Sequence, residues 1–131
     1  MIKVGFIINF NSKKWLGGFN LIINLIKSLR ILKKKQIEPI LIIDENVPLN
    51  ELKSLNIKII KTNYFSKEKT YQRIFNKILI HLFGKSYLYD RFFKILKIDI
   101  LSHTLLSLGK KSSIKSFPWI PDFQYYHYPE N

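Results

Sequence analysis

The sequence contains no cysteine, and glycine, proline and acidic residues are few. The absence of cysteine excludes disulfide bonds, cysteine-ligated zinc and a cysteine nucleophile, and it fits a protein of the reducing cytoplasm. The apolar run at residues 1–10 is too short for a signal peptide, and no run of about 18 apolar residues predicts a membrane span. The three histidines lack the spacing of a metal site, so no metal is expected.

What the sequence does have is basic charge and enough apolar residues for a core. The chain has 131 residues, the size of one domain, and 47% of them are hydrophobic. It has 22 basic and 9 acidic residues, with the basic excess in two blocks, 1–35 and 58–97. This balance favours partners that carry phosphate, namely nucleic acid, anionic lipid or a nucleotide substrate. The alternative is a coding bias toward lysine, which would need no partner.

Apolar periodicity predicts alternating strands and helices. Short and nearly continuous apolar runs predict strands, and apolar residues at helical spacing predict helices. The expected strands cover 2–10, 38–44, 57–62, 99–104 and the first part of 114–123. The expected helices cover 19–35, 47–56, 66–83 and 87–97, and residues 105–113 are expected to form a turn or a short helix.

This alternation predicts an α/β fold, with a Rossmann-like parallel sheet of about five strands and flanking helices in a single domain. Ligands of such sheets bind outside the carboxyl ends of the strands. We therefore expect a binding site to involve residues 11–18, the segment just after Asp44, and residues 103–104 together with 119–124.

Three groups of residues in these loops could carry chemistry. Gly17 and Gly18 would let backbone amides approach a negatively charged ligand, although they match neither a dinucleotide fingerprint nor a phosphate-binding loop; the alternative is a tight turn. Asp122, between stiffening prolines and two residues before Gln124, suits hydrogen bonding to sugar hydroxyls or a base role; the alternative is a carboxylate that caps its own loop. His103 could bind phosphate or relay a proton, or it could be structural.

The segment 64–97 mixes aromatic and basic residues. An amphipathic basic helix of this kind could lie on an anionic membrane surface, and interleaved aromatic residues could instead stack on single-stranded nucleic acid. No signature of a common RNA-binding domain is present, which places nucleic acid behind a membrane. Helices that simply cover the sheet would explain the pattern without a partner, and within them His81 is expected to be packed.

Three segments together resemble a known family. They are GGFNLIINLIKSLR after the first strand, DILSHT at the fourth strand, and WIPDFQYYHYPEN at the end. In this order they resemble the amino-terminal domain of group 1 (family 4) GT-B glycosyltransferases, and the last segment resembles one subgroup that has WIPDFQ followed by Pro-Glu. The resemblance extends over the whole chain.

The resemblance implies a transferase that moves a sugar from a nucleotide sugar to a glycan or lipid-linked acceptor. It implies that Gly17 and Gly18 face the donor phosphates, that His103 lies near the acceptor, and that Trp119, Asp122 and Gln124 line the acceptor side, with Asp122 as the candidate catalytic residue. It further implies a second, donor-binding domain that residues 1–131 do not include, so that this chain alone should be inactive. No cofactor is implied, and the enzyme would be cytoplasmic, with possible contact to the inner face of a membrane.

The sequence departs from the family pattern at two positions. Pro121 stands where many members have a histidine before the aspartate, and Tyr125 stands where the subgroup often has a histidine after the glutamine. His127 lies two residues further on. Position alone therefore assigns no histidine of this chain a catalytic role.

Overall fold

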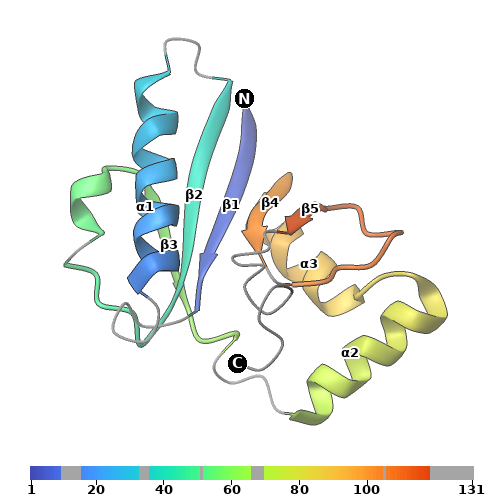
Figure 1. Cartoon of the computed structure of the whole chain (residues 1–131). Helices are drawn as coiled ribbons and strands as arrows, with labels where there is room; N and C mark the ends of the chain where they lie inside the picture. Colours follow the sequence, from blue (N-terminus) through green and yellow to red (C-terminus); the bar gives the residue numbers. More distant parts are fainter. Residues whose placement is uncertain (10–15, 33–35, 51, 66–69, 105, 119–131) are drawn as a thin grey trace, which may run out of the picture.

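The structure is a computed structural model that describes residues 1–9, 16–32, 36–50, 52–65, 70–104 and 106–118. Strands and helices alternate along these segments, as Figure 1 shows. The strands are β1 (Ile2–Ile8), β2 (Ile37–Asp44), β3 (Lys58–Thr62), β4 (Ile100–Thr104) and β5 (Lys115–Pro118). The helices are α1 (Leu16–Ile31), the 3-10 turn η1 (Lys53–Leu55), α2 (Thr70–Phe83) and α3 (Tyr87–Ile95).

All five strands form one parallel sheet in the order β3-β2-β1-β4-β5. The chain moves outward from β1 to β3 on one side and then crosses to β4 and β5 on the other. The Rossmann-like α/β fold that the sequence predicts is therefore confirmed. Its order also puts the topological switch point between β1 and β4, where such sheets form a crevice at their carboxyl edge.

Each face of the sheet has its own hydrophobic cluster, and β2 contributes to both. Leu41 and Ile43 point toward α1, whereas Ile40 and Ile42 point toward α3, and all four side chains are fully buried. Full burial of each such side chain contributes about 1.5–3 kcal/mol. The predicted burial of this strand on both faces is confirmed, because a parallel strand covered on both sides needs apolar residues at every position.

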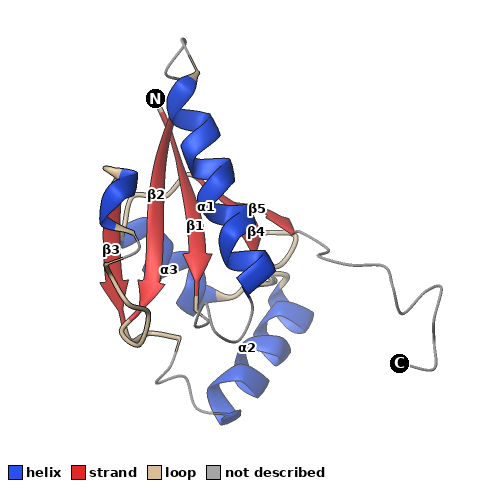
Figure 2. Cartoon of the chain, turned by 60° about the vertical axis from the view of Figure 1, so that its left-hand side comes forward, coloured by secondary structure: helices blue, strands red, loops and turns tan. Residues whose placement is uncertain are grey.

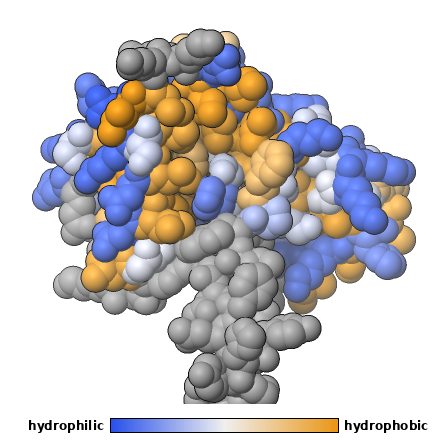
Figure 3. Space-filling view, turned by 45° about the horizontal axis from the view of Figure 1, so that its top comes forward, coloured by the Kyte–Doolittle hydropathy of each residue, from blue (hydrophilic) through white to orange (hydrophobic). Residues whose placement is uncertain are grey.

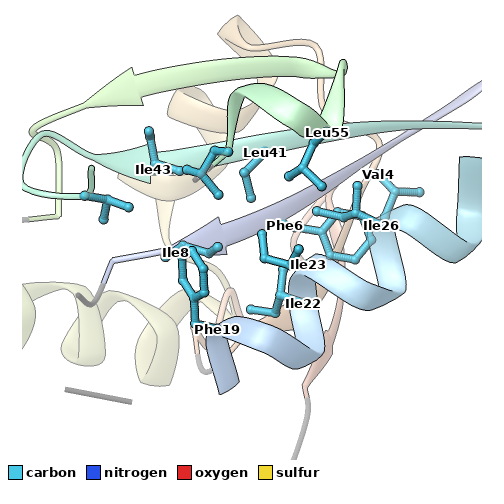
Figure 4. Packing of buried hydrophobic residues seen from close by; sticks show 12 residues of the cluster. Val4, Phe6, Ile8, Phe19, Ile22, Ile23, Ile26, Leu41, Ile43 and Leu55 are labelled. Carbon is cyan, nitrogen blue, oxygen red and sulfur yellow. The ribbon is translucent and has the colours of Figure 1, made fainter. Parts of the chain in front are cut away.

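One of the two clusters lies on the α1 side of the sheet. Phe19, Ile22, Ile23 and Ile26 lie on one stripe of α1 and pack on Val4, Phe6 and Ile8 of β1, as Figure 4 shows. The stripe has the helical spacing that the sequence predicts. On the opposite side, Tyr89 and Phe93 of α3 pack on Ile7 and Leu101. The two layers of helices are separated by the sheet in Figure 2.

Several predicted boundaries are wrong. Helix α1 begins at Leu16, so Gly17 and Gly18 belong to its first turn and not to a loop. The helix expected at 47–56 is reduced to η1, which ends at Leu55 and is followed by Asn56 in the left-handed conformation. Of the two alternatives for 105–113, the turn is confirmed for the described residues between β4 and β5. Strand β5 covers Lys115–Pro118 of the expected 114–123 strand, and residues 119–123 lie outside the described residues.

The two edges of the sheet differ in character. Apolar side chains are exposed near the amino-terminal edge and the end of α1, among them Met1, Ile2, Ile31 and Leu32. Figure 3 shows the face that includes this edge, where apolar side chains gather between hydrophilic ones. At the carboxyl edge, polar residues such as Asn9, Asp44 and Thr104 end or follow the strands, which makes this edge the candidate binding site. Within the described segments, no helix combines the length and the apolar character needed to cross a membrane.

Candidate functional site at the carboxyl edge of the sheet

His103 occupies an irregular position at the carboxyl end of β4. Its φ is 53°, in the left-handed region, and the pairing of β4 with β5 shifts between Ser102 and Thr104. Left-handed backbone is uncommon for residues other than glycine, and bulges near the ends of strands often re-aim a side chain. Regular alternation would point His103 toward α3 like Leu101, yet its ring lies 6.3 Å from that of Phe6, on the α1 side. The bulge therefore turns the imidazole to the α1 side of the sheet.

The imidazole of His103 is held by its neighbour. Nδ1 lies 2.7 Å from Oγ of Ser102, so that one of the two groups donates a hydrogen bond to the other. Partial burial lowers the pKa of His103 below its ordinary value near 6.5. The ring is accordingly neutral at pH 7, and a neutral imidazole can both donate and accept a proton.

The lowered pKa predicts a pH dependence of stability. The unfolded chain takes up a proton on this histidine near pH 6.5, whereas the folded chain does so at lower pH. Stability is therefore expected to decrease as the pH falls from about 6.5 toward the folded pKa of His103. Above about pH 6.5, this histidine should have no effect on the pH dependence of stability. His103→Asn tolerates the left-handed backbone and cannot titrate. Urea unfolding between about pH 5 and 8 should show a smaller loss in this variant; identical pH profiles would contradict the assignment.

Gly17 and Gly18 lie at the same edge, in the first turn of α1. Gly18 is buried, Gly17 is exposed, and among the described residues a β carbon added at Gly17 would meet nothing within 4 Å. Figures 1 and 2 place this end of α1 at the edge where the arrowheads of β1 and β2 end. The first N–H groups of a helix lack partners within the helix and favour negative charge nearby. The sequence predicts a loop here and not a helix, but it predicts correctly that the glycines lie at the carboxyl edge of the sheet.

A cavity of about 350 Å³ opens at the same edge, on the α2 and α3 side. It lies at the switch point, because Asn9 follows β1 and Ser107 follows β4. Its walls mix basic, amide and aromatic side chains with a few apolar ones. The lining residues are Asn9, Phe65, Arg73, Asn76, Lys77, Ile80, Tyr89, Leu106 and Ser107. A second hollow of about 780 Å³ shares Ile80, Leu106 and Ser107 with it and extends toward β5.

The polar wall of this cavity is provided mainly by α2. Arg73 and Lys77 are one turn apart and exposed, and Asn76 between them is buried and accepts a hydrogen bond of 2.8 Å from Ser86 Oγ. Two cations one turn apart suit an anionic ligand, with aromatic Phe65 and Tyr89 as apolar walls. These lining residues were not identified from the sequence. The signal that could have found them is the i, i+4 spacing of two basic residues on a helix that begins at the carboxyl edge.

The remaining predicted residues divide into two groups. Asp44 ends β2 and is buried, but its Oδ1 accepts hydrogen bonds from the backbone N (3.2 Å) and Nδ2 (3.1 Å) of Asn46, which makes it a turn-forming residue. Trp119, Asp122 and Gln124 lie outside the described residues. Among the residues that are described, no group of three or more potential ligands could hold a metal ion.

The structure thus brings together part of the site that the sequence predicts. Gly17, Gly18 and His103 lie at the carboxyl edge and on the α1 side of the sheet, and the basic cavity lies at the same edge on the other side. Comparison of the chain with protein-family models, with curated proteins and with solved structures gave no match.

Proposed function

We propose that this chain is the amino-terminal, acceptor-side part of a GT-B glycosyltransferase that uses a nucleotide sugar as donor. The observation that carries the proposal is the position of three residues that the sequence indicates as site candidates. Gly17 and Gly18 stand at the amino end of α1, and His103 stands on a bulge at the end of β4, on the same side of the sheet and at its carboxyl edge. Carboxyl edges of parallel sheets are where nucleotides and sugars bind in α/β folds.

The chemistry of the proposed reaction fits these groups. Transfer from a nucleotide sugar leaves a diphosphate, whose charge must be stabilised as the bond to the sugar breaks. Backbone N–H groups at the first turn of α1 can approach such an anion, because Gly17 has no side chain and no described atom lies within 4 Å of a β carbon added there. Neutral His103 can accept a hydrogen bond from an acceptor hydroxyl.

In this proposal, Trp119, Asp122 and Gln124 keep the acceptor-side roles that the resemblance gives them, and Asp122 stays the candidate base. The donor-binding residues of the family belong to a second domain, so residues 1–131 alone are proposed to be inactive. We further propose that the enzyme works in the cytoplasm and needs no metal or cofactor.

The proposal is tested with the product of the whole gene. The purified protein is incubated with a panel of uridine and guanosine diphosphate sugars and with a membrane extract of its source as acceptor, and the release of nucleoside diphosphate is measured. We expect turnover of at least one donor. A whole gene product that neither transfers nor hydrolyses any sugar of the panel overturns the proposal.

A matched pair of variants locates the activity. Gly17→Val adds a side chain whose β carbon meets none of the described atoms within 4 Å, so it should leave the fold intact yet obstruct a diphosphate at the first turn of α1. We expect turnover to fall by at least about tenfold, the equivalent of one lost phosphate contact. Asn24→Val, on the exposed part of the same helix, should retain activity. Equal activity of the two variants contradicts the position of the donor, and thermal unfolding checks that both are folded.

A further inference from the structure

Helix α2 exposes its apolar face. Tyr71, Ile74, Phe75, Ile78 and Leu82 recur at helical spacing and form what we call the apolar stripe of α2. Their exposed fractions lie between 49% for Ile78 and 67% for Leu82. Apolar stripes of surface helices normally face the core, and contiguous exposed ones indicate a binding surface.

The buried side of α2 is instead polar at its centre. Asn76 is 3% exposed and bonded to Ser86, the residue that caps α3, and Ile80 lies one turn further along. At 100° per residue, Asn76 and Ile80 lie roughly opposite the stripe, whose members centre on Tyr71 and Ile78. The helix is therefore anchored to the domain through one side while the stripe is directed away from it.

Further apolar side chains are exposed where α2 is joined to α3 and on α3 itself. The rings of Phe83 and Tyr87 are in contact with their centroids 6.1 Å apart, and Nζ of Lys85 lies 4.5 Å from the centroid of the Tyr87 ring. Beyond them, Leu88 and Ile95 are exposed on the outer side of α3. The connection between the helices thus joins two apolar surfaces and places aromatic rings and a cation between them.

The charges around this surface have one sign. Residues 70–97 contain six basic side chains and a single acidic one, Asp90. Asp90 is buried, is hydrogen-bonded by Ser112 and Ser113, and has Nζ of Lys94 3.9 Å from its carboxylate, so its charge is partly offset by that lysine. The basic residues are Arg73, Lys77, Lys85, Arg91, Lys94 and Lys97. At 100° per residue, Arg73 and Lys77 lie away from the stripe and line the cavity, so the cations beside the exposed apolar residues are those of the connection and of α3. Exposed apolar side chains with these cations beside them complement a surface that is apolar below and anionic above.

We propose that α2 and α3 dock on an anionic lipid membrane, with the apolar stripe of α2 entering the headgroup region. The 14 residues of α2 extend over about 21 Å, enough to lie in the plane of an interface. Long lysine and arginine side chains reach lipid phosphates while their stems stay apolar, and tyrosine favours such interfaces. A second copy of the chain is a less suitable partner, because its basic side chains would face those of the first copy. Nucleic acid is also less suitable, because it would leave the isoleucines and the leucine of the stripe in water.

The test is flotation of the full chain with lipid vesicles. Vesicles of phosphatidylcholine alone are compared with vesicles of roughly three parts phosphatidylcholine to one part phosphatidylserine at low and high salt. We expect binding to the anionic vesicles, weakened by salt. Ile74→Ser with Ile78→Ser should reduce the partition coefficient by at least about tenfold, because two apolar side chains no longer enter the lipid. Ile31→Ser, which changes an exposed isoleucine of α1, serves as the apolar control and should bind normally.

A second pair of variants tests the charge. Arg91→Glu is expected to weaken binding to anionic vesicles severalfold, whereas Lys27→Glu, the same change on the exposed side of α1, has a smaller effect. All these positions are exposed, and equal thermal unfolding temperatures confirm intact folds.

Two kinds of result overturn the proposal. One is the absence of binding to anionic vesicles at low salt, whether or not single-stranded DNA binds. The other is binding that the stripe variants and the Ile31 control reduce equally, or a stripe-dependent dimer in light scattering without lipid binding. Docking does not depend on the proposed transferase activity, since it is measured without any sugar.

Discussion

Gly109→Ala is expected to lower the free energy of unfolding by about 2–4 kcal/mol, the sum of a left-handed backbone cost and local overpacking. Gly109 has a φ of 88°, and a β carbon there would collide with the backbone at Gly84 and would lie 2.8 Å from Cα of Lys85. Neither neighbour can move cheaply, because Ser86 N donates to Leu108 O at 3.0 Å and Lys111 N donates to Gly84 O at 2.8 Å. The turn at Gly109 therefore fixes the connection between α2 and α3.

The matched control for this variant is Gly17→Ala. Gly17 lies in a helix without a positive φ, and its added methyl group would meet no atom of the described segments within 4 Å. Alanine should therefore stabilise the chain by up to about 1 kcal/mol through helix propensity. Chemical denaturation of both variants measures the contrast. A Gly109 variant as stable as the wild type would show that the turn at this position can relax.

The parts of the fold that the sequence predicts well are those where burial and periodicity agree. The run from Ile40 to Ile43 predicts a strand that is buried on both faces, because a strand in a parallel sheet buries consecutive residues on alternate faces. The start of α1 is harder to predict, since Gly17 and Gly18 lower helix propensity, while the packing of Phe19 on β1 supports a helix that begins earlier.

The segment 47–56 shows why apolar spacing can predict the wrong element. Val47, Leu52 and Leu55 are buried against the α1-side cluster, and their spacing resembles that of a helix. In the folded chain these side chains are buried from turns and from η1, without a longer helix. Arg30 of α1 donates a hydrogen bond of 2.7 Å to the carbonyl of Leu55, which provides a partner for an end of η1. The sequence alone gives no sign of this contact, because Arg30 and Leu55 are 25 residues apart.

The candidate site was predictable in position but not in form. The strand-end rule correctly places Gly17, Gly18 and His103 at one edge, yet the bulge that turns His103 depends on how β4 pairs with β5. His81 was expected to be packed and is exposed, because a helical period identifies an apolar stripe without showing what covers it. For the same reason, the cavity beside Arg73 and Lys77 emerges only once α2 is placed.

The second large effect is expected at Asp90, which joins α3 to the turn before β5. Its carboxylate accepts hydrogen bonds from the hydroxyls of Ser112 and Ser113 and from the backbone N of Ser113, and Lys94 Nζ lies 3.9 Å away. Asp90→Ala leaves these donors without their acceptor inside the protein, and it should lower the free energy of unfolding by about 3 kcal/mol. Exposed Glu45 provides the control, since Glu45→Gln should change stability by less than about 0.5 kcal/mol.

The same carboxylate predicts a characteristic dependence on pH. Burial acts to raise the pKa of Asp90, but the hydrogen bonds from Ser112 and Ser113 and the charge of Lys94 outweigh it, so the pKa lies below the ordinary 3.8. A lowered pKa in the folded state contributes stability above the pKa of the unfolded chain, and this contribution is lost as the pH falls through the folded value. The stability difference between the wild type and Asp90→Ala should therefore be largest near pH 7 and shrink below about pH 4. A difference that stays constant from neutral to acidic pH would show that the contribution of Asp90 comes from packing and not from its charge.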